Sequence, residues 1–167
     1  SVPNIVIANE QTKGKGRLGR SFHSPASKGI YMSVAFEPDF GMDKAMLVTT
    51  VAALAVCKAF ETTVGVGPKI KWVNDIYIGD KKVCGILTEG GFGTNGTLDY
   101  AILGVGVNLF EPKNGFPSNL PLANSVFGKD SKIVFKKRKK ERLIAEFIKV
   151  FLKFYNNLSQ FVSRCFI

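Results

Sequence analysis

Short apolar runs separated by polar turns predict most of the β-structure in this chain. The runs are rich in β-branched residues, which favours strands, and the first run is apolar enough to be expected in a buried position. Gly79–Asp80, between two runs, is typical of a tight hairpin turn, and residues 94–96 are typical of another. The pattern therefore predicts strands at 4–9, 29–36 and 69–73, a hairpin over 75–91, and a long strand at 97–110.

Two longer segments predict helices. Residues 43–64 are too long and too apolar for one strand, and they predict a mostly buried helix with Asp43 as N-cap and Gly65 as its stop. Residues 137–158 carry apolar side chains at helical spacing, which indicates an amphipathic helix. Residues 111–131 contain three prolines and no clear periodicity, so we expect a loop there.

The order of these elements predicts one α+β domain, a mixed β-sheet with helices packed on one face. The chain has 167 residues, 46% of them hydrophobic, which is enough for a real core and excludes a disordered chain. The longest apolar stretch, residues 45–57, is too short to span a bilayer. Three widely spaced cysteines favour reduced thiols in a cytoplasmic protein.

Net positive charge is confined to two stretches. The chain carries +10, of which residues 13–20 supply +4 and residues 132–142 supply +6, so the remainder is neutral. The second stretch includes five consecutive cations at 136–140, which could bind nucleic-acid phosphates. No aromatic side chains alternate with them, which favours a solvated helix face instead.

The first basic stretch is a glycine-rich loop, QTKGKGRLGRSFHSP (11–25). Its GKGRLG segment satisfies the dinucleotide pattern G-x-G-x-x-G, and the loop nearly matches a P-loop with Arg20 in place of the lysine. Both patterns require a helix directly after the glycines, whereas Pro25, Gly29 and a strand follow here, so both are rejected. Two interpretations stay open: a mobile surface loop, or a loop whose backbone N–H groups and arginines bind an anion.

Several motifs in a fixed order resemble those of the biotin protein ligases, also called biotin–acetyl-CoA-carboxylase ligases. That family has a Q-T-x-G-R-G-R-x-G-R loop before a W-x-S-P segment, followed by K-W-P-N-D, K-x-x-G-I-L and G-x-G-I-N. Order and spacing agree over residues 5–110, and the ordered set is far more specific than any one motif. Here the motifs are Gln11–Thr12 with Gly14–Arg20, Phe22–Pro25, Lys71–Asp75, Lys82–Leu87 and Gly104–Asn108.

The resemblance implies a class II aminoacyl-tRNA-synthetase-like fold, shared with lipoate ligases, and a two-step reaction. Biotin's carboxylate attacks the α-phosphate of ATP, giving biotinyl-5′-adenylate and pyrophosphate. A lysine of a biotin carboxyl carrier domain then takes the biotinyl group as an amide. Mg²⁺ is expected with ATP. No membrane partner and no DNA-binding domain in this chain are expected, and a homodimer is left open.

The resemblance also assigns roles to individual residues. Gln11 would hydrogen-bond the ureido ring of biotin, while Lys15, Gly16 and Arg17 would line biotin and the adenylate. Lys71 would contact the biotin carboxylate and the α-phosphate. Lys71 and Arg17 are the catalytic candidates, because a carboxylate approaching a polyphosphate needs fixed cations, and a closing loop would keep water from the adenylate. Weaker candidates for the nucleotide end are Arg20, Phe22, Asn74 and Asn108.

Other residues have structural interpretations. We expect Trp72 in the core, and Asn74–Asp75 could simply shape a turn. His23 is the only histidine, which gives little support to a Ser-His-Asp triad or a histidine metal site. Asp75 and Glu89 could help to hold Mg²⁺ near ATP, but their spacing does not show it, so no metal ligands are predicted. Three glycines could serve only close packing: Gly85, Gly104 and Gly106.

The chain departs from the family pattern in places. Val73 stands where proline is usual, Phe22 where tryptophan is frequent, and Lys15 and Leu18 where arginines are common. The opening SVPN does not match the family's S-T-N segment, and many members continue beyond this C-terminus. We therefore expect residues 1–167 to be a catalytic core, truncated at the N-terminus and lacking a small C-terminal β-domain. The rival functions are a lipoate-type ligase, whose loop should not show this Gly/Arg pattern, and a basic nucleic-acid-binding module.

Overall fold

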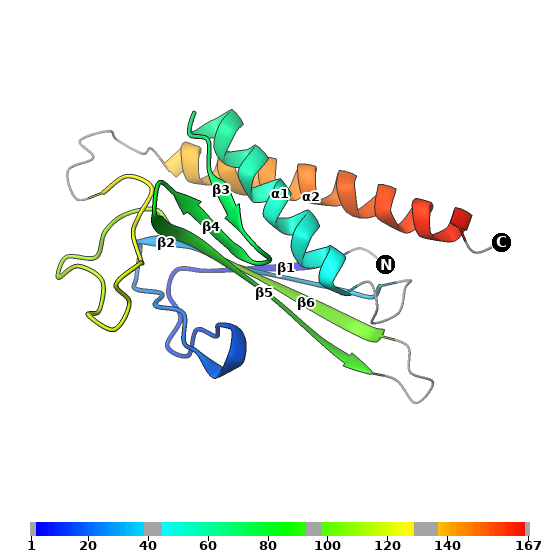
Figure 1. Cartoon of the computed structure of the whole chain (residues 1–167), viewed down its shortest axis with the longest axis horizontal. Coiled ribbons are helices and arrows are strands. Elements are labelled where there is room, and N and C mark those ends of the chain that lie inside the picture. Colours follow the sequence, from blue (N-terminus) through cyan, green and yellow to red (C-terminus); the bar gives the residue numbers. More distant parts are fainter. Residues whose placement is uncertain (1–2, 39–44, 93–97, 129–136, 166–167) are drawn as a thin grey trace.

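The strands of the computed structural model form one six-stranded sheet (Figure 1). The described residues are 3–38, 45–92, 98–128 and 137–165. The helices are α1 (Ala45–Thr63), α2 (Lys137–Cys165) and the short 3₁₀ helix η1 (Arg17–Gly19). Across the sheet the strands lie in the order β1 (Asn4–Ala8), β2 (Gly29–Phe36), β6 (Leu98–Asn108), β5 (Lys81–Phe92), β4 (Asp75–Ile78) and β3 (Lys69–Lys71).

The predicted α+β class is confirmed, and the sheet is antiparallel rather than mixed. Every pair of neighbouring strands runs antiparallel. One cause is local: β3, β4 and β5 follow one another through short turns, which favour antiparallel pairing. Among the described residues one isolated parallel bridge occurs, between Lys82 of β5 and Ala123, which belongs to no named strand.

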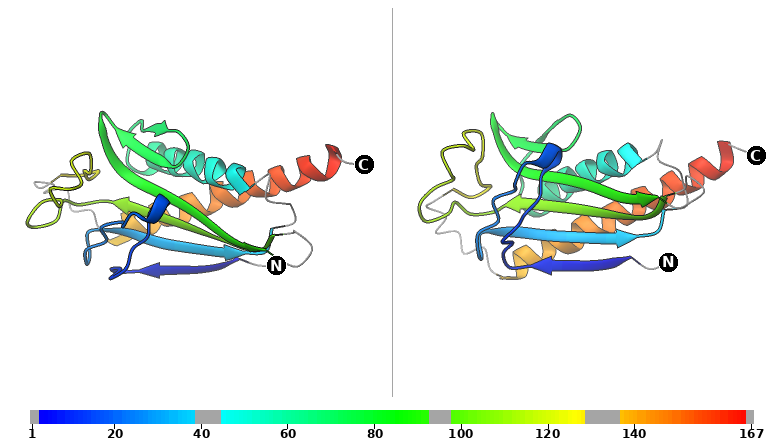
Figure 2. Two further views of the ribbon diagram at one scale, coloured as in Figure 1. Left: turned by 60° about the horizontal axis from the view of Figure 1, so that its bottom comes forward. Right: turned by 90° about the horizontal axis from the view of Figure 1, so that it is seen from below.

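Both long helices cover the same face of the sheet, and the core lies between the two layers (Figures 1 and 2). Side chains alternate along a strand, so Leu103, Val105 and Val107 of β6 all point into this core. Helix α1 meets the sheet through small residues, including the fully buried Ala52 and Ala59, which allow a close approach. Helix α2 adds the aromatic and aliphatic side chains Leu143, Phe147, Val150 and Phe151.

Both predicted helices are present. Helix α1 ends as expected at Gly65, which has a φ of +78° and donates its N–H to the Phe60 carbonyl at 3.0 Å. The expected N-cap, Asp43, lies outside the described residues. Helix α2 begins at Lys137, as the spacing predicts, and continues to Cys165. The basic run therefore opens α2, although its residues before 137 are outside the described part of the chain.

One helical span among the described residues, Met46–Thr63 of α1, is long and apolar enough to cross a membrane by length and composition. Its mean hydropathy is 1.4. The buried side of this helix packs on the sheet, and Thr49 Oγ1 lies 2.7 Å from Thr88 Oγ1 of β5. We therefore interpret α1 as the core helix of this domain.

The predicted hairpin is confirmed, with Gly79–Asp80 between β4 and β5 and Gly79 at a φ of +58°. The second predicted turn, at 94–96, lies outside the described residues. Residues 111–128 contain neither a named strand nor a helix, as expected.

Two predictions about burial are wrong. The first strand, β1, lies at the edge of the sheet beyond the reach of α1 and α2, so Ile5, Val6 and Ile7 are exposed, Val6 to 65%. Trp72 is 71% exposed, because in the turn between β3 and β4 it is the neighbouring Val73 that points inward. The peptide bond between these two residues is cis.

Candidate functional site

A hollow of about 240 Å³ lies on the sheet face opposite the helices, and glycines form part of its floor. The pleat that sends Val105 and Val107 into the core turns Gly104 and Gly106 to the other face. Gly106 pairs with Gly85 of β5 in the sheet register, and Gly104 pairs with Leu87. The lack of side chains at these positions leaves space above β5 and β6.

The glycines of the floor have different neighbours. A Cβ atom on Gly106 would lie 2.5 Å from the ring of Phe22, and one on Gly85 would lie 3.1 Å from the same ring. Phe22 therefore rests on this glycine pair, in agreement with the close-packing interpretation. Gly104 differs, since the nearest atom to a Cβ there would be the Leu87 carbonyl oxygen at 3.5 Å. The space above Gly104 is open to a ligand.

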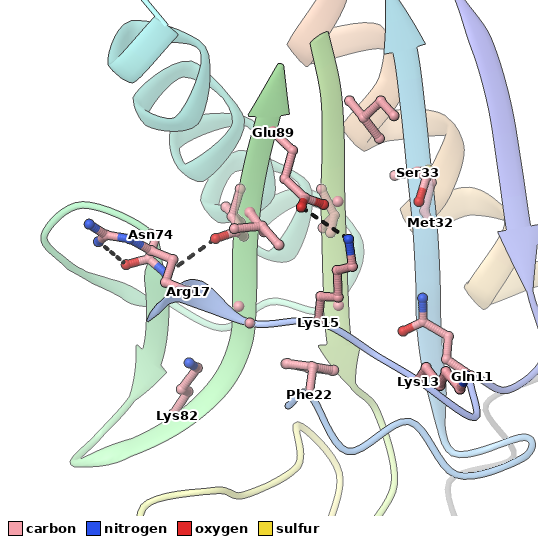
Figure 3. Close-up of a pocket in the computed structure, with 18 residues that line it drawn as sticks. Gln11, Lys13, Lys15, Arg17, Phe22, Met32, Ser33, Asn74, Lys82 and Glu89 are labelled. Atoms are coloured by element: carbon pink, nitrogen blue, oxygen red, sulfur yellow. Dashed lines mark hydrogen bonds and ion pairs between the residues drawn. The ribbon is translucent and has the colours of Figure 1, made fainter. Parts of the chain in front are cut away.

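The glycine-rich loop folds as an irregular hairpin that crosses the sheet on the face opposite the helices (Figure 2), and its side chains line this hollow (Figure 3). Backbone hydrogen bonds join Gln11 to Ser24 and Phe22 to Gly14 across the hairpin, and Ser24 Oγ donates to Gln11 Oε1 at 2.8 Å. Gly14 is required here, because its Cβ would lie 2.4 Å from the Phe22 carbonyl oxygen. At the base, Tyr31 Oη donates to the Pro25 carbonyl at 2.9 Å, and burial raises the pKa of Tyr31 to about 12.

Two side chains of the loop bind the sheet on the far side of the hollow (Figure 3). Lys15 Nζ makes an ion pair with Glu89 Oε1 of β5 at 3.2 Å. Arg17 Nη1 donates to Asn74 Oδ1, in the turn before β4, at 3.0 Å. Each contact is solvent-exposed and is worth little alone. Together they hold the loop across the cavity.

A third cation enters the cavity from β5. Lys82 Nζ makes a 2.7 Å ion pair with Asp75 Oδ1, and both side chains are largely shielded from solvent. Asn74 Nδ2 donates to the same Asp75 oxygen at 3.0 Å and to the Ile86 carbonyl at 3.1 Å. Asn74 thus connects Arg17 on the loop with the Asp75–Lys82 pair on the sheet.

The structure brings together most of the residues that the sequence singles out. Those that line the cavity are Gln11, Lys15, Gly16, Arg17, Phe22 and Asn74. Asn74 also shapes the turn between β3 and β4, as the structural interpretation of Asn74–Asp75 predicts, and its role toward a nucleotide stays a prediction.

Three predicted site residues do not line the cavity. Lys71 is exposed on β3, and its Nζ lies over the ring of Tyr77, 5.4 Å from the centroid. Arg20 is exposed beyond η1, where its backbone carbonyl accepts a hydrogen bond from the N–H of Gly16. Asn108 is buried and donates to the Asn124 carbonyl at 3.1 Å, so it anchors the loop that follows β6.

Several lining residues carried no predicted role in binding. Lys82 is the first residue of the K-x-x-G-I-L motif, and this place in the motif is the sequence feature that could have indicated a role in binding. The ion pair of Glu89 with Lys15 joins residues 74 positions apart, so no local pattern could indicate it. The others are Lys13, Met32, Ser33, Ile86, Leu87, Ile102 and Val105.

The cavity suits a small ligand that has an apolar body and carries anionic groups. Its floor is glycine and aliphatic side chains, while four cations and one carboxylate line it. Among the described residues no group of three or more His, Cys, Asp or Glu side chains could hold a metal ion. His23 contacts Phe116 edge-on at 6.4 Å, as a loop residue would.

Known proteins are similar to this chain in sequence and in fold. Residues 1–108 match the biotin/lipoate A/B protein ligase family. The bifunctional ligase/repressor BirA of Bacillus subtilis is 39% identical over 116 residues, which make up 70% of this chain and 35% of that protein. The biotin–[acetyl-CoA-carboxylase] ligase of Paracoccus denitrificans is 36% identical over 106 residues, 62% of this chain and 43% of that protein. The chain thus spans about a third of the length of the Bacillus relative.

Solved structures agree with the fold. The biotin protein ligase from Aquifex aeolicus in complex with biotin and ATP superposes with a TM-score of 0.73 at 26% identity, covering 93% of this chain and 62% of that one. The biotin protein ligase from Leishmania major in complex with biotinyl-5-AMP has a TM-score of 0.69 at 22% identity, covering 93% and 65%. The second likeness concerns the fold alone.

Proposed function

Because the chain belongs to the biotin/lipoate A/B protein ligase family, we propose that it activates biotin with ATP and transfers the biotinyl group to a lysine of a biotin carboxyl carrier domain. The observation that carries this proposal is the cavity itself, with a glycine floor below and the cation-bearing loop above. The Gly/Arg pattern of that loop, together with the biotin ligases among the relatives, favours biotin over lipoate.

The apolar body of biotin would lie above Gly104, with its ureido ring toward Gln11. The Oε1 atom of Gln11 already accepts from Ser24, so the amide nitrogen is the group left to donate to the ligand. The biotin carboxylate would then meet Lys15 and compete with Glu89 for its ammonium group. Such an exchange keeps Lys15 paired with and without substrate.

The first step brings a carboxylate against a polyphosphate, and fixed cations lower its barrier by neutralising the charge that develops. Arg17 and Lys82 both line the cavity, one from the loop and one from β5, and both are held through Asn74 and Asp75. We assign Arg17 to the retention of biotin and the adenylate, since it sits on the loop. Lys82 is a second cation suited to a phosphate.

Lys71 keeps the role that the family resemblance implies, with a conformational requirement. Its ammonium group lies over the ring of Tyr77, and Lys71 does not line the cavity. An exposed lysine has a flexible four-carbon stem, and a nearby polyphosphate attracts it more strongly than an aromatic ring does. We therefore propose that Lys71 turns from Tyr77 toward the carboxylate and the α-phosphate when the substrates bind.

Mg²⁺ would arrive with ATP rather than occupy a site made by the described residues alone. The described residues hold no cluster of metal ligands, and Mg²⁺ is commonly held by substrate phosphates with few protein carboxylates. Asp75 and Glu89 are each paired with a lysine. We further propose a cytoplasmic location, in keeping with free rather than paired cysteines at positions 57 and 84.

We also propose that a second copy of this chain binds through the edge strand β1 to form a homodimer. Ile5, Val6 and Ile7 are exposed on this strand, and its outer edge pairs with no other strand among the described residues. Two such edges from separate copies can pair and cover one another. Sedimentation of the wild type beside Val6→Lys tests this, and equal monomer fractions in both would exclude β1 as the contact.

Calorimetry tests the binding half of the proposed function. We expect heat with biotin and tighter binding of a non-hydrolysable biotinyl-adenylate analogue, because the analogue also occupies the cationic end of the cavity. Heat with lipoate and none with biotin or the analogue would overturn the assignment.

A further inference from the structure

We propose that the rim formed by Leu18 and Trp72 is the docking surface for the acyl-acceptor domain, and that this domain presents its lysine on an acidic surface. The inference rests on the proposed function, because it concerns the protein that receives the biotinyl group. Trp72 is 71% exposed and Leu18 is 88% exposed, and both belong to segments that bound the cavity.

A hydrogen bond 3.0 Å long between Arg17 and Asn74 joins the two segments that carry these side chains. Leu18 follows Arg17 directly, and Trp72 lies two positions before Asn74. A partner that contacts both therefore touches the loop and the sheet at once. It would also approach the cavity from the side on which the loop is fastened (Figure 3).

The exposure of these side chains is built into the local backbone. Leu18 has φ 56° and ψ 41°, a left-handed conformation that a bulky residue rarely adopts. Trp72 occupies the turn in which Val73 takes the buried position. Tryptophan is the residue most typical of an interface anchor, since it offers a large apolar area with few rotatable bonds.

Charge specifies the kind of partner. The loop over residues 11–22 and the β3 segment over residues 69–74 contain no Asp or Glu. All the cations of these two segments are exposed: Lys13, Lys15, Arg17, Arg20, Lys69 and Lys71. An acceptor with carboxylates around its target lysine would be steered to this rim, and a basic one would be repelled.

Kinetics of four variants test the surface. Trp72→Ala and Lys69→Glu change the rim without touching a residue of the proposed catalytic machinery. The matched controls are Leu54→Gln, an exposed apolar residue on α1, and Lys153→Glu, an exposed cation on α2, both on the helix side of the sheet. Biotin-dependent exchange of pyrophosphate into ATP, measured without any acceptor, should match the wild type in all four.

Transfer of the biotinyl group to the unbiotinylated carrier domain of an acetyl-CoA carboxylase should distinguish the two rim variants from the two controls. Trp72→Ala should raise the KM for that domain by about tenfold or more, as loss of an aromatic anchor does. Lys69→Glu should slow association and weaken its salt dependence, and the controls should behave like the wild type. Wild-type KM values in both rim variants would overturn the inference.

The single tryptophan supplies a direct readout. Emission of Trp72 should shift to shorter wavelength and become protected from acrylamide when the carrier domain is added, whereas a duplex DNA of similar charge should leave it unprotected. Unchanged emission at carrier concentrations that saturate transfer, or equal protection by DNA, would overturn the inference. The exchange of pyrophosphate into ATP is measured without an acceptor, so it tests the proposed function and not the docking surface. Absence of biotin-dependent exchange would therefore contradict the proposed function itself.

Discussion

The open floor position, Gly104, gives the sharpest test of where the ligand lies. In Gly104→Val the nearest atoms to the new Cβ are the Leu87 carbonyl oxygen at 3.5 Å and the Leu87 Cβ at 3.9 Å, which are ordinary contacts. The backbone φ there is compatible with any residue, and valine favours strands. The free energy of unfolding should therefore stay constant or rise by up to about 1 kcal/mol.

The same substitution, Gly104→Val, should weaken the binding of biotin although it leaves the fold as stable or more stable. Three added carbon atoms would occupy a cavity of about 240 Å³ at the place where the ligand rests. Overpacking of this kind costs about 1–3 kcal/mol, and each 1.4 kcal/mol is a factor of ten, so the Kd for biotin should rise by about 5- to 140-fold.

Calorimetry with biotin and urea unfolding measure the two effects separately. Gly67→Val is the matched control, because a Cβ there would meet nothing within 4 Å and Gly67 does not line the cavity. A folded Gly104→Val protein that binds biotin with the wild-type Kd would refute the placement of the ligand above the glycine floor.

Three further predictions follow from the loop and the core. Glu89→Gln removes the ion pair with Lys15, so trypsin should cut the loop faster in the variant than in the wild type, and biotin with ATP should slow cleavage in both; equal rates in every state would exclude a fastening role. Lys71→Ala should lower adenylate formation by about 10²–10³-fold, whereas Arg17→Ala should form adenylate and release it, labelling bystander albumin on a streptavidin blot. Normal adenylation by Lys71→Ala, or strict carrier labelling by Arg17→Ala, would contradict this division of roles. Burial raises the pKa of Cys57 from 9.0 to about 11, so the unfolded thiol ionises first and the free energy of unfolding should fall as pH rises from 9 to 11. Burial raises the pKa of Cys84 as well, so in urea titrations Cys57→Ala should make that slope shallower without removing it, and an unchanged slope would contradict the assignment.

Local backbone features of this fold were predictable from the sequence. Gly79–Asp80 and Gly65 act through φ values that few other residues adopt, so the turn and the helix end depend on neighbouring residues only. Burial was less predictable, because it depends on what packs against an element. The apolar run of β1 predicts a buried strand, yet β1 lies at the edge of the sheet and its apolar side chains are exposed. Trp72 is also exposed, because its neighbour Val73 takes the buried position in the turn.

The residues of the candidate site were likewise predictable where they belong to a local sequence pattern, and not where they depend on contacts between distant segments. The motifs identified the loop, Asn74 and the glycines, because each carries a short sequence pattern. The arrangement of the site depends on strand register, which sets Gly85 opposite Gly106 and brings Glu89 to Lys15 across 74 positions. No local pattern contains that information. For Lys71, the motif identifies the residue, but the direction of its side chain depends on the contact of its ammonium group with the ring of Tyr77.

Pyrophosphate release is the measurement that tests the central claim most directly. The purified chain is supplied with ATP and Mg²⁺, with biotin, lipoate or neither, and the pyrophosphate formed is followed over time. Activation of biotin inside the glycine-floored cavity predicts release that requires biotin, is absent with lipoate, and falls in Gly104→Val. Release that is independent of biotin, or that lipoate supports and biotin does not, would contradict it.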